Sequence, residues 1–264
     1  MVFETIRLDA QGLKELPASL ASEQELVHLS VYDNALTHLP EWLWSLQKLQ
    51  TLNLSVNRLT TLPETIGLLD QLRMLDIGHN HITTLPEALG NLPTLTDFLY
   101  LSDNGIQQLP ATLTKLSSLR YLNVTDNQLT ALPEDIGRMR GLIELRAYRN
   151  PLTALPDSIG SLIKLRELHL DQTPLTHLPE SIGELQALRV LSVRGCRLTA
   201  LPASIGELAQ LRHLDLRGNG LTDLPEAIVG LPNLEKLDLR WNHDLIRFPR
   251  WLETLEDRGC IVFR

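Results

Sequence analysis

Residues 201–222 read LPASIGELAQLRHLDLRGNGLT, and residues 62–83 (LPETIGLLDQLRMLDIGHNHIT) and 155–176 (LPDSIGSLIKLRELHLDQTPLT) carry the same pattern. The proline of the LP pair recurs every 23 residues, except at two steps of 24. Eleven prolines mark the units: Pro17, Pro40, Pro63, Pro86, Pro110, Pro133, Pro156, Pro179, Pro202, Pro225 and Pro249. A fixed period of this length is typical of stacked repeats. We therefore expect one repeat domain over 1–264, with about eleven repeats.

Each unit contains an LxL pair, such as Leu214-Asp215-Leu216, in which apolar and polar residues alternate. This alternation predicts a short strand with one buried face. Equivalent strands recur in the same direction, so stacked units predict a parallel sheet. After the LP pair, apolar residues three apart, such as Ile182 and Leu185, predict one turn of α- or 3-10 helix on the opposite side.

The LxxLxLxxN core at this repeat length resembles the leucine-rich repeat family. The phrase LPxxIGxL resembles the Ras-group-related class, which includes plant intracellular Ras-group repeat proteins, Ras-suppressor-like scaffolds, bacterial Roco repeat domains and some bacterial effectors. The resemblance implies an α/β repeat fold: a leucine-rich repeat solenoid, or curved horseshoe, with a parallel concave sheet and short α or 3-10 segments on its convex side. It also implies binding of other proteins.

One column of the repeat holds a polar residue after the strand. Eight units have asparagine there: Asn34, Asn57, Asn80, Asn104, Asn127, Asn150, Asn219 and Asn242. An asparagine amide can satisfy backbone groups of its own turn and of the neighbouring unit. Gln11, Thr173 and Cys196 take this place in the other units, and we expect a weaker ladder at Thr173 and Cys196.

The two ends of the chain differ from the central units. At the start, Phe3, Ile6 and Leu8 keep the repeat register. At the other end, RFPRWLETLEDRGCIVFR departs from the pattern and predicts a cap at about 248–264 that ends in a strand over 260–263. We expect Phe248 and Trp251 to seal the last core layer.

Composition excludes several classes of protein. The 264 residues are 43% hydrophobic and 21% charged, with a net charge of −8, which disfavours nucleic-acid and anionic-membrane partners. Two cysteines exclude a disulfide scaffold, and no apolar run is long enough for a membrane helix. Because the start lacks a secretory signal pattern, we expect a cytoplasmic protein, or one in a host cytoplasm if a Sec-independent route delivers it.

Aromatic residues gather on the outward strand positions, six, four and two residues before the asparagine column. All four tyrosines lie there (Tyr32, Tyr100, Tyr121 and Tyr148), together with Phe98, and Trp241 lies on the rim. Exposed aromatic residues are common anchors of binding surfaces. Tyrosine also favours strands for packing alone, so both interpretations stay open.

The 24-residue unit next to this cluster has one extra residue between Leu95 and Leu99. The extra residue predicts either a β-bulge that redirects side chains or an insertion accommodated at the strand entrance.

Charge on the outward positions is asymmetric, with acids up to Asn127 and arginines beyond it. Arg194, Arg217 and Arg240 form a column in consecutive units, about 5 Å apart. Asp171, Asp215 and Asp238 can neutralise this column internally. The alternative is a patch that receives carboxylates or phosphates of a partner.

The candidate partner-binding residues share the outward face or its rim. They are Tyr32, Phe98, Tyr100, Tyr121, Arg146, Tyr148, Arg149, His169, Arg194, Arg217, Arg240 and Trp241.

The sequence contains no phosphate loop, GxSxG, HExxH or CxxC motif, so we expect no enzyme activity, no cofactor and no metal. His79 and His81 with Asp76 or Asp103 offer only a weak metal-binding arrangement.

The sequence therefore predicts a non-enzymatic interaction module, of a scaffold or signal-transduction type, that binds a protein or peptide on its concave face. The alternative is a substrate-targeting repeat domain of a larger kinase, GTPase or ubiquitin ligase. We expect no nucleic-acid or membrane partner, and a monomer rather than a dimer. An antiparallel dimer through the acidic and basic halves is the alternative.

Overall fold

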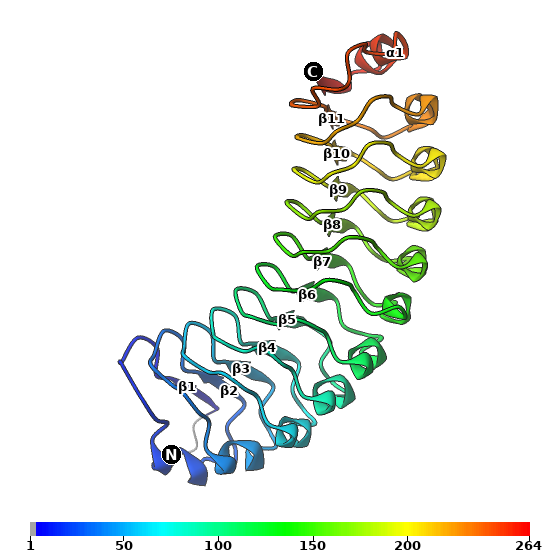
Figure 1. The fold of residues 1–264 in the computed structure, drawn as a ribbon. Helices are drawn as coiled ribbons and strands as arrows, with labels where there is room; N and C mark the ends of the chain where they lie inside the picture. The colour runs from blue at the N-terminus through cyan, green and yellow to red at the C-terminus, as the bar shows by residue number, and fades with distance from the viewer. Residues whose placement is uncertain (1–3) are drawn as a thin grey trace. The chain divides into compact units, whose positions relative to one another are not determined.

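The computed structural model describes residues 4–264 and divides the chain into two compact units, Met1–Gln128 and Leu129–Arg264. Phe3, which the pattern assigns to the first strand, lies outside the described residues. In each unit, short parallel strands lie on one side and 3-10 helices on the other (Figure 1).

In its described part, the first unit holds six strands and five 3-10 helices. Neighbouring strands pair in parallel and in chain order, one residue against one. The strands are β1 (Thr5–Arg7), β2 (His28–Ser30), β3 (Thr51–Asn53), β4 (Met74–Asp76), β5 (Phe98–Tyr100) and β6 (Tyr121–Asn123). The helices are η1 (Ala18–Ser22), η2 (Glu41–Ser45), η3 (Glu64–Leu68), η4 (Glu87–Asn91) and η5 (Ala111–Lys115).

The second unit, all of which is described, has the same organisation and ends in an α-helix and a last strand. Its strands are β7 (Glu144–Arg146), β8 (Glu167–His169), β9 (Val190–Ser192), β10 (His213–Asp215), β11 (Lys236–Asp238) and β12 (Ile261–Phe263). Its helices are η6 (Ile136–Arg138), η7 (Asp157–Ser161), η8 (Glu180–Glu184), η9 (Ala203–Glu207), η10 (Glu226–Gly230) and α1 (Trp251–Asp257).

The predicted alternation within each strand is confirmed by burial. In β10, Leu214 is buried while His213 and Asp215 are not, and the central leucine is buried in every strand from β2 to β11. Ser192 and Asp238 are exceptions at the outward positions, since both are also buried. Leucines from successive units stack into a continuous apolar layer in each unit, because one repeat alone cannot remove its leucines from water.

The helical turn predicted as α or 3-10 is a 3-10 helix in every repeat before the cap. Pro202 stands before η9 in an extended conformation, and its carbonyl accepts a hydrogen bond from Ile205 N–H at 3.2 Å. Proline suits this place because it has no N–H to leave unpaired. Ile205 is buried, which anchors the turn against the strand layer.

The asparagine column forms a hydrogen-bonded ladder. The Asn127 side-chain Nδ2 donates to the carbonyls of Leu101 (2.9 Å) and Val124 (3.0 Å), while its Oδ1 accepts the N–H of Ile106 (3.0 Å). One buried side chain therefore satisfies backbone groups of two neighbouring repeats, as the sequence predicts.

The C-terminal segment closes the second unit differently from the expectation. Phe248 is 40% exposed and Trp251 is half-buried, whereas Leu252, Leu255 and Cys260 are buried. The helix α1 turns Leu252 and Leu255, three residues apart, onto the core, so the prediction that Phe248 and Trp251 seal it was wrong.

Candidate binding surfaces

Three aromatic side chains form one cluster on the strand face of the first unit. Ring centroids of Phe98 and Tyr100 lie 5.8 Å apart with nearly parallel planes, and those of Tyr100 and Tyr121 lie 5.0 Å apart. Phe98 and Tyr121 are register partners on β5 and β6, with centroids 5.7 Å apart. We call Phe98, Tyr100 and Tyr121 the aromatic cluster. Its rings combine apolar area with hydroxyl groups and limited side-chain entropy, which suits a contact surface.

The extra residue of the 24-residue unit lies at the entrance of β5. Within the paired strand, Met74, Leu75 and Asp76 face Phe98, Leu99 and Tyr100 one to one. Just before it, Arg120 N–H donates to the carbonyl of Thr96. The paired strand is therefore regular, and the structure favours an insertion at the strand entrance over a bulge within it. Asp97, at this entrance, accepts hydrogen bonds from Arg73 at 3.2 and 3.3 Å.

Tyr32 lies apart from the aromatic cluster, beside a hollow of about 570 Å³ over β1–β4 of the first unit. Asp9 Oδ1 accepts hydrogen bonds from the Ser30 hydroxyl and from Tyr32 N–H. The hollow is lined by Thr5, Ile6, Arg7, Asp9, His28, Leu29, Ser30, Tyr32, Thr51, Asn53 and Met74. Most of these residues were not among the predicted site residues.

The first outward residues of the second unit are already paired with one another. Arg146 bonds to Glu144, and His169 Nε2 lies 3.1 Å from Glu167 Oε2. Candidate ligand atoms of Glu144, Glu167 and His169 lie within 4.8 Å of one another. Sequence reasoning missed this group as a potential cation-binding set, because the two glutamates are 23 residues apart and meet only through strand pairing. Tyr148 contacts Arg149, whose Cζ lies 5.2 Å from the tyrosine ring centroid.

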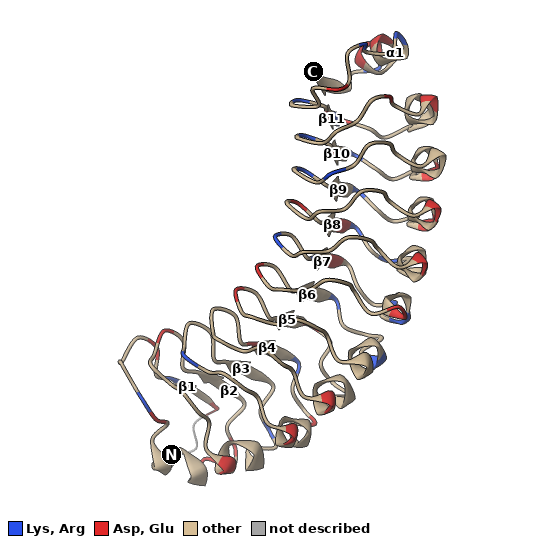
Figure 2. Cartoon of the chain, in the orientation of Figure 1, with Lys and Arg blue, Asp and Glu red and all other residues tan. Residues whose placement is uncertain are grey.

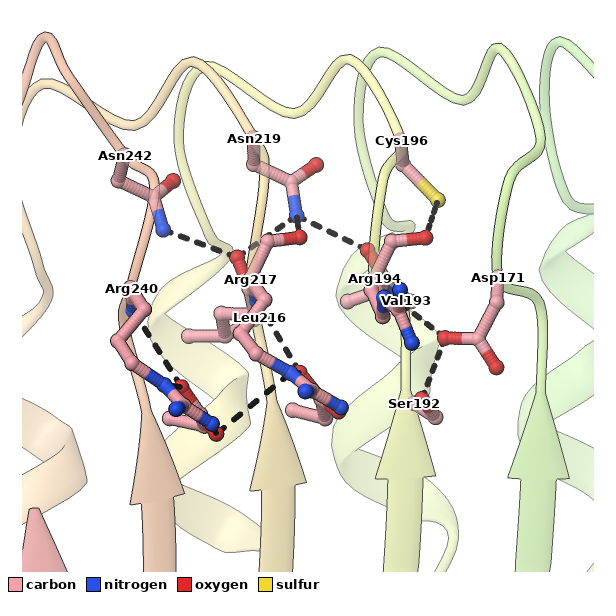
Figure 3. A network of polar contacts seen from close by, with 12 residues as sticks. Asp171, Ser192, Val193, Arg194, Cys196, Leu216, Arg217, Asn219, Arg240 and Asn242 are labelled. Atoms are coloured by element: carbon pink, nitrogen blue, oxygen red, sulfur yellow. Dashed lines mark hydrogen bonds and ion pairs between the residues drawn. The ribbon is translucent and has the colours of Figure 1, made fainter. Parts of the chain in front are cut away.

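Two arginines of the predicted column hold carboxylates of their own strands (Figure 3). Arg217 Nε donates to both oxygens of Asp215, at 2.8 and 3.0 Å. Arg240 forms a two-point contact with Asp238, at 2.9 and 2.7 Å. Asp238 Oδ2 also lies 3.5 Å from Arg217 Nε, so the two pairs form one network. Neutralisation within the chain therefore accounts for Arg217 and Arg240.

The buried carboxylate of Asp238 is ionised by this network. Burial alone would raise the pKa of Asp238, but hydrogen bonds from Arg240 and the charges of Arg240 and Arg217 outweigh burial and lower it. Hydrogen bonds to Asp215 and Asp238 in turn raise the pKa of Arg217 and Arg240. The same hydrogen bonds hold both guanidinium groups in place.

Arg194 is different. Its backbone N–H donates to Asp171 Oδ1, but its exposed guanidinium forms no hydrogen bond or ion pair with the described residues. The interpretation that aspartates of the chain neutralise the arginine column therefore fails for Arg194.

Trp241 is 55% exposed at the rim, where its φ of 63° places the backbone in the left-handed region. Arg240 Cζ lies 5.6 Å from the Trp241 ring and 4.7 Å from the Phe263 ring. These cation–π contacts help fix the Arg240 side chain. Phe263, on β12, is a neighbour that the sequence analysis did not place on this surface.

Charge is distributed unevenly within the second unit. Figure 2 shows Arg and Lys on the loops after β9, β10 and β11, and Asp and Glu on the helices. The first turns of η7, η8 and η10 carry Asp157, Glu180 and Glu226.

Among residues 4–264, no helix combines the length and the apolar character needed to cross a bilayer.

Comparison with known proteins agrees with this geometry. Family models match residues 153–257 (leucine-rich repeat region), 48–106 and 118–139 (both leucine-rich repeat), which together cover more than half of the chain. The chain is a leucine-rich repeat protein, with the parallel strands and 3-10 helices of that fold. No curated protein sequence matches it.

Three solved structures are similar to the chain. A Leptospira interrogans leucine-rich repeat protein is 29% identical, with 96% of this chain and 82% of that chain covered and a TM-score of 0.49. PEPR1 in a PEPR1–AtPEP1 structure is 28% identical (98% and 38% covered, TM-score 0.82). The plant peptide hormone receptor RGFR1, in complex with RGF2, is 24% identical (98% and 47% covered, TM-score 0.74). The chain therefore spans less than half the length of these last two proteins.

Proposed function

We propose that this chain is a non-enzymatic module that binds a protein or peptide through its strand face. The observation that supports this most directly is the aromatic cluster, where three rings pack on one another although Phe98 remains 43% exposed. Leucine-rich repeat domains typically bind proteins or peptides, and the similar PEPR1 was solved with AtPEP1. Burying such rings against a partner removes apolar area from water at low entropic cost.

The test compares partner capture by the parent chain and by a variant with Phe98→Ala, Tyr100→Ala and Tyr121→Ala. Losing buried aromatic anchors should weaken binding by at least about 30-fold. A matched control carries Leu68→Ala and Ile163→Ala, which remove exposed apolar residues outside the strand face. Circular dichroism of each variant checks that the fold is retained.

A partner captured by the parent and by the control, but not by the aromatic variant, supports the proposal. Equal capture by all three proteins contradicts the assignment of the aromatic cluster. Tyr148→Ala, tested separately, asks whether the second unit contributes.

The second candidate function is a targeting domain of a larger signalling or effector enzyme, such as a kinase, GTPase or ubiquitin ligase. The coverage of only 38% and 47% of PEPR1 and RGFR1 motivates it. A longer reading frame that encodes a catalytic domain would support it, and a frame limited to these repeats would contradict it. For either function we propose a cytoplasmic location, which imaging of the tagged full-length protein tests.

A further inference from the structure

One position separates the repeat of β9 from the two repeats that follow it, those of β10 and β11. In β10 and β11, the outward residue two places before the arginine is an aspartate, Asp215 or Asp238, and it binds that arginine. In β9 the equivalent residue is Ser192, paired in register with Asp215. Arg194 therefore has no carboxylate on its own strand.

The nearest acid on the preceding strand is already engaged. Asp171 Oδ1 accepts hydrogen bonds from the Ser192 hydroxyl and, at 2.9 Å, from the Arg194 backbone N–H. In Figure 3 the other oxygen of Asp171 points away from Arg194. Asp9, Ser30 and Tyr32 repeat this arrangement in the first unit, where the Tyr32 side chain is likewise exposed. The serine–aspartate pair thus satisfies the backbone and leaves the outward side chain free.

The rim beside Arg194 has two glycines in consecutive repeats. Gly195 and Gly218, with φ of 66° and 65°, occupy a rim position at which other repeats carry a side chain, such as Gln172 and Trp241. Gln172 lies beside Gly195, with its Cγ 3.4 Å from where a Cβ of Gly195 would be, whereas a Cβ at Gly218 would meet only the backbone of Gly195. A partner chain can therefore approach the guanidinium over the two glycines, on the side away from Gln172. Trp241 offers an exposed apolar surface at the edge of this opening.

We infer that Arg194 binds an aspartate or glutamate side chain of a partner polypeptide, which supplies the carboxylate that Ser192 cannot. Charge complementarity selects this occupant, because Arg217 and Arg240 each bind the aspartate two residues before them through more than one hydrogen bond. The inference rests on the proposed function only in taking the partner to be a polypeptide.

The probe is an acetylated, amidated hexaglutamate peptide, added while the arginine Nε–Hε signals are followed by NMR. The matched probe is the hexaglutamine peptide, and inorganic phosphate forms a third arm. The Arg194 signal, identified by its absence in Arg194→Lys, should shift saturably with hexaglutamate and not with hexaglutamine. A response to phosphate without a response to hexaglutamate overturns the inference.

Two variants of nearly equal shape decide the mechanism. Ser192→Asp places a carboxylate where Asp215 and Asp238 stand, so it should pair with Arg194 and weaken hexaglutamate binding by roughly tenfold or more. Ser192→Asn adds the same volume without charge and should weaken binding much less. Equal binding by both variants overturns the inference.

Arg194→Gln, at an exposed site, provides the same test if Ser192→Asp does not fold, because unchanged hexaglutamate binding by Arg194→Gln also overturns the inference. The aromatic cluster is intact in all these proteins. The Arg194 and Ser192 variants therefore test only the carboxylate site, and the variant of the aromatic cluster tests only the proposed function.

Discussion

Two residues of the asparagine column show what a single side chain contributes to this fold. In a regular repeat the Asn Oδ1 accepts a hydrogen bond from a backbone N–H of the preceding repeat, as Asn219 does from Leu198 at 3.0 Å. Thr173 and Cys196 provide no such acceptor. Among the described residues, the N–H groups of Leu152 and Leu175, their counterparts, form no hydrogen bond. The predicted weakness of the ladder is thus located at two buried backbone donors.

Cys196→Asn should therefore stabilise the protein. An asparagine there can accept the Leu175 N–H and donate to the carbonyls of Leu170 and Val193, so the free energy of unfolding should rise by about 1 kcal/mol. Urea unfolding followed by circular dichroism measures the change. Cys196→Ala is the control and should lower stability, because it also removes the weak bond from Sγ to the Leu170 carbonyl. An asparagine variant no more stable than the alanine variant would contradict the argument.

The buried thiols predict how stability depends on pH. Burial raises the pKa of Cys196 and of Cys260 above the ordinary value of 9.0. The stability that each buried thiol contributes is present below the ordinary thiol pKa and is lost as pH rises. The reason is that the thiols of the unfolded chain lose their protons at a lower pH than the buried thiols of the folded protein. Between about pH 8 and about pH 10, each thiol should lower the free energy of unfolding by up to about 1.4 kcal/mol per pH unit.

The measurement is urea unfolding at both pH values, for the parent and for the double variant Cys196→Ala/Cys260→Ala. The parent should lose more stability than the variant between the two values. Equal losses would show that other groups account for the alkaline sensitivity.

At the scale of elements, glycines decide how closely successive 3-10 helices stack. A Cβ at Gly183 in η8 would lie 2.5 Å from the Ser204 carbonyl oxygen and 2.8 Å from Ser204 Cβ in η9. Gly137 and Gly160 meet the backbone of the next helix in the same way, at 2.1 and 2.5 Å. By contrast, a Cβ at Gly230 in η10 meets nothing within 4 Å. Gly230 lies one residue further along its helix than Gly183, and Val229 takes the equivalent place in η10.

Gly183→Ala should therefore destabilise the protein by about 1–3 kcal/mol, through overpacking against a backbone that cannot move aside. Gly230→Ala, at a helical glycine with open space around it, is the control and should be neutral or stabilising by up to about 1 kcal/mol. Chemical denaturation of both variants gives the comparison. A neutral Gly183→Ala would mean that the helices tolerate a wider spacing.

At the scale of the whole molecule, we predict a monomer at micromolar concentration in both low and high salt. Arg212, Arg217 and Arg240 of the second unit already pair with acids of the same unit, which reduces the positive charge available to a second copy. Sedimentation velocity at the two salt concentrations is the measurement. A dimer that forms only in low salt would support antiparallel pairing of the acidic and basic halves instead.

Much of the architecture was determined by the sequence itself. The 23-residue period, the LxL alternation and the asparagine column predicted parallel strands, buried leucines and the ladder, because each depends on residues within one unit and on repetition. The aromatic cluster followed from the same register: Phe98 and Tyr121 lie in equivalent positions, so strand pairing had to bring them together.

Tertiary structure decided which side chains remain free. Arg194, Arg217 and Arg240 share one column, and the structure shows that each of the last two is held by the aspartate two residues before it. Ser192 takes that place before Arg194, and Asp171 bonds to the backbone instead, so only Arg194 of the three has no side-chain partner among the described residues. The hollow beside Tyr32 and the Glu144–Glu167–His169 group likewise depend on side chains from different strands. Even the core of the cap was reassigned from Phe248 to Leu252 and Leu255, because a non-repeating segment has no register to read. The repeat specifies where a side chain points, but hydrogen bonding across strands determines what it is free to bind.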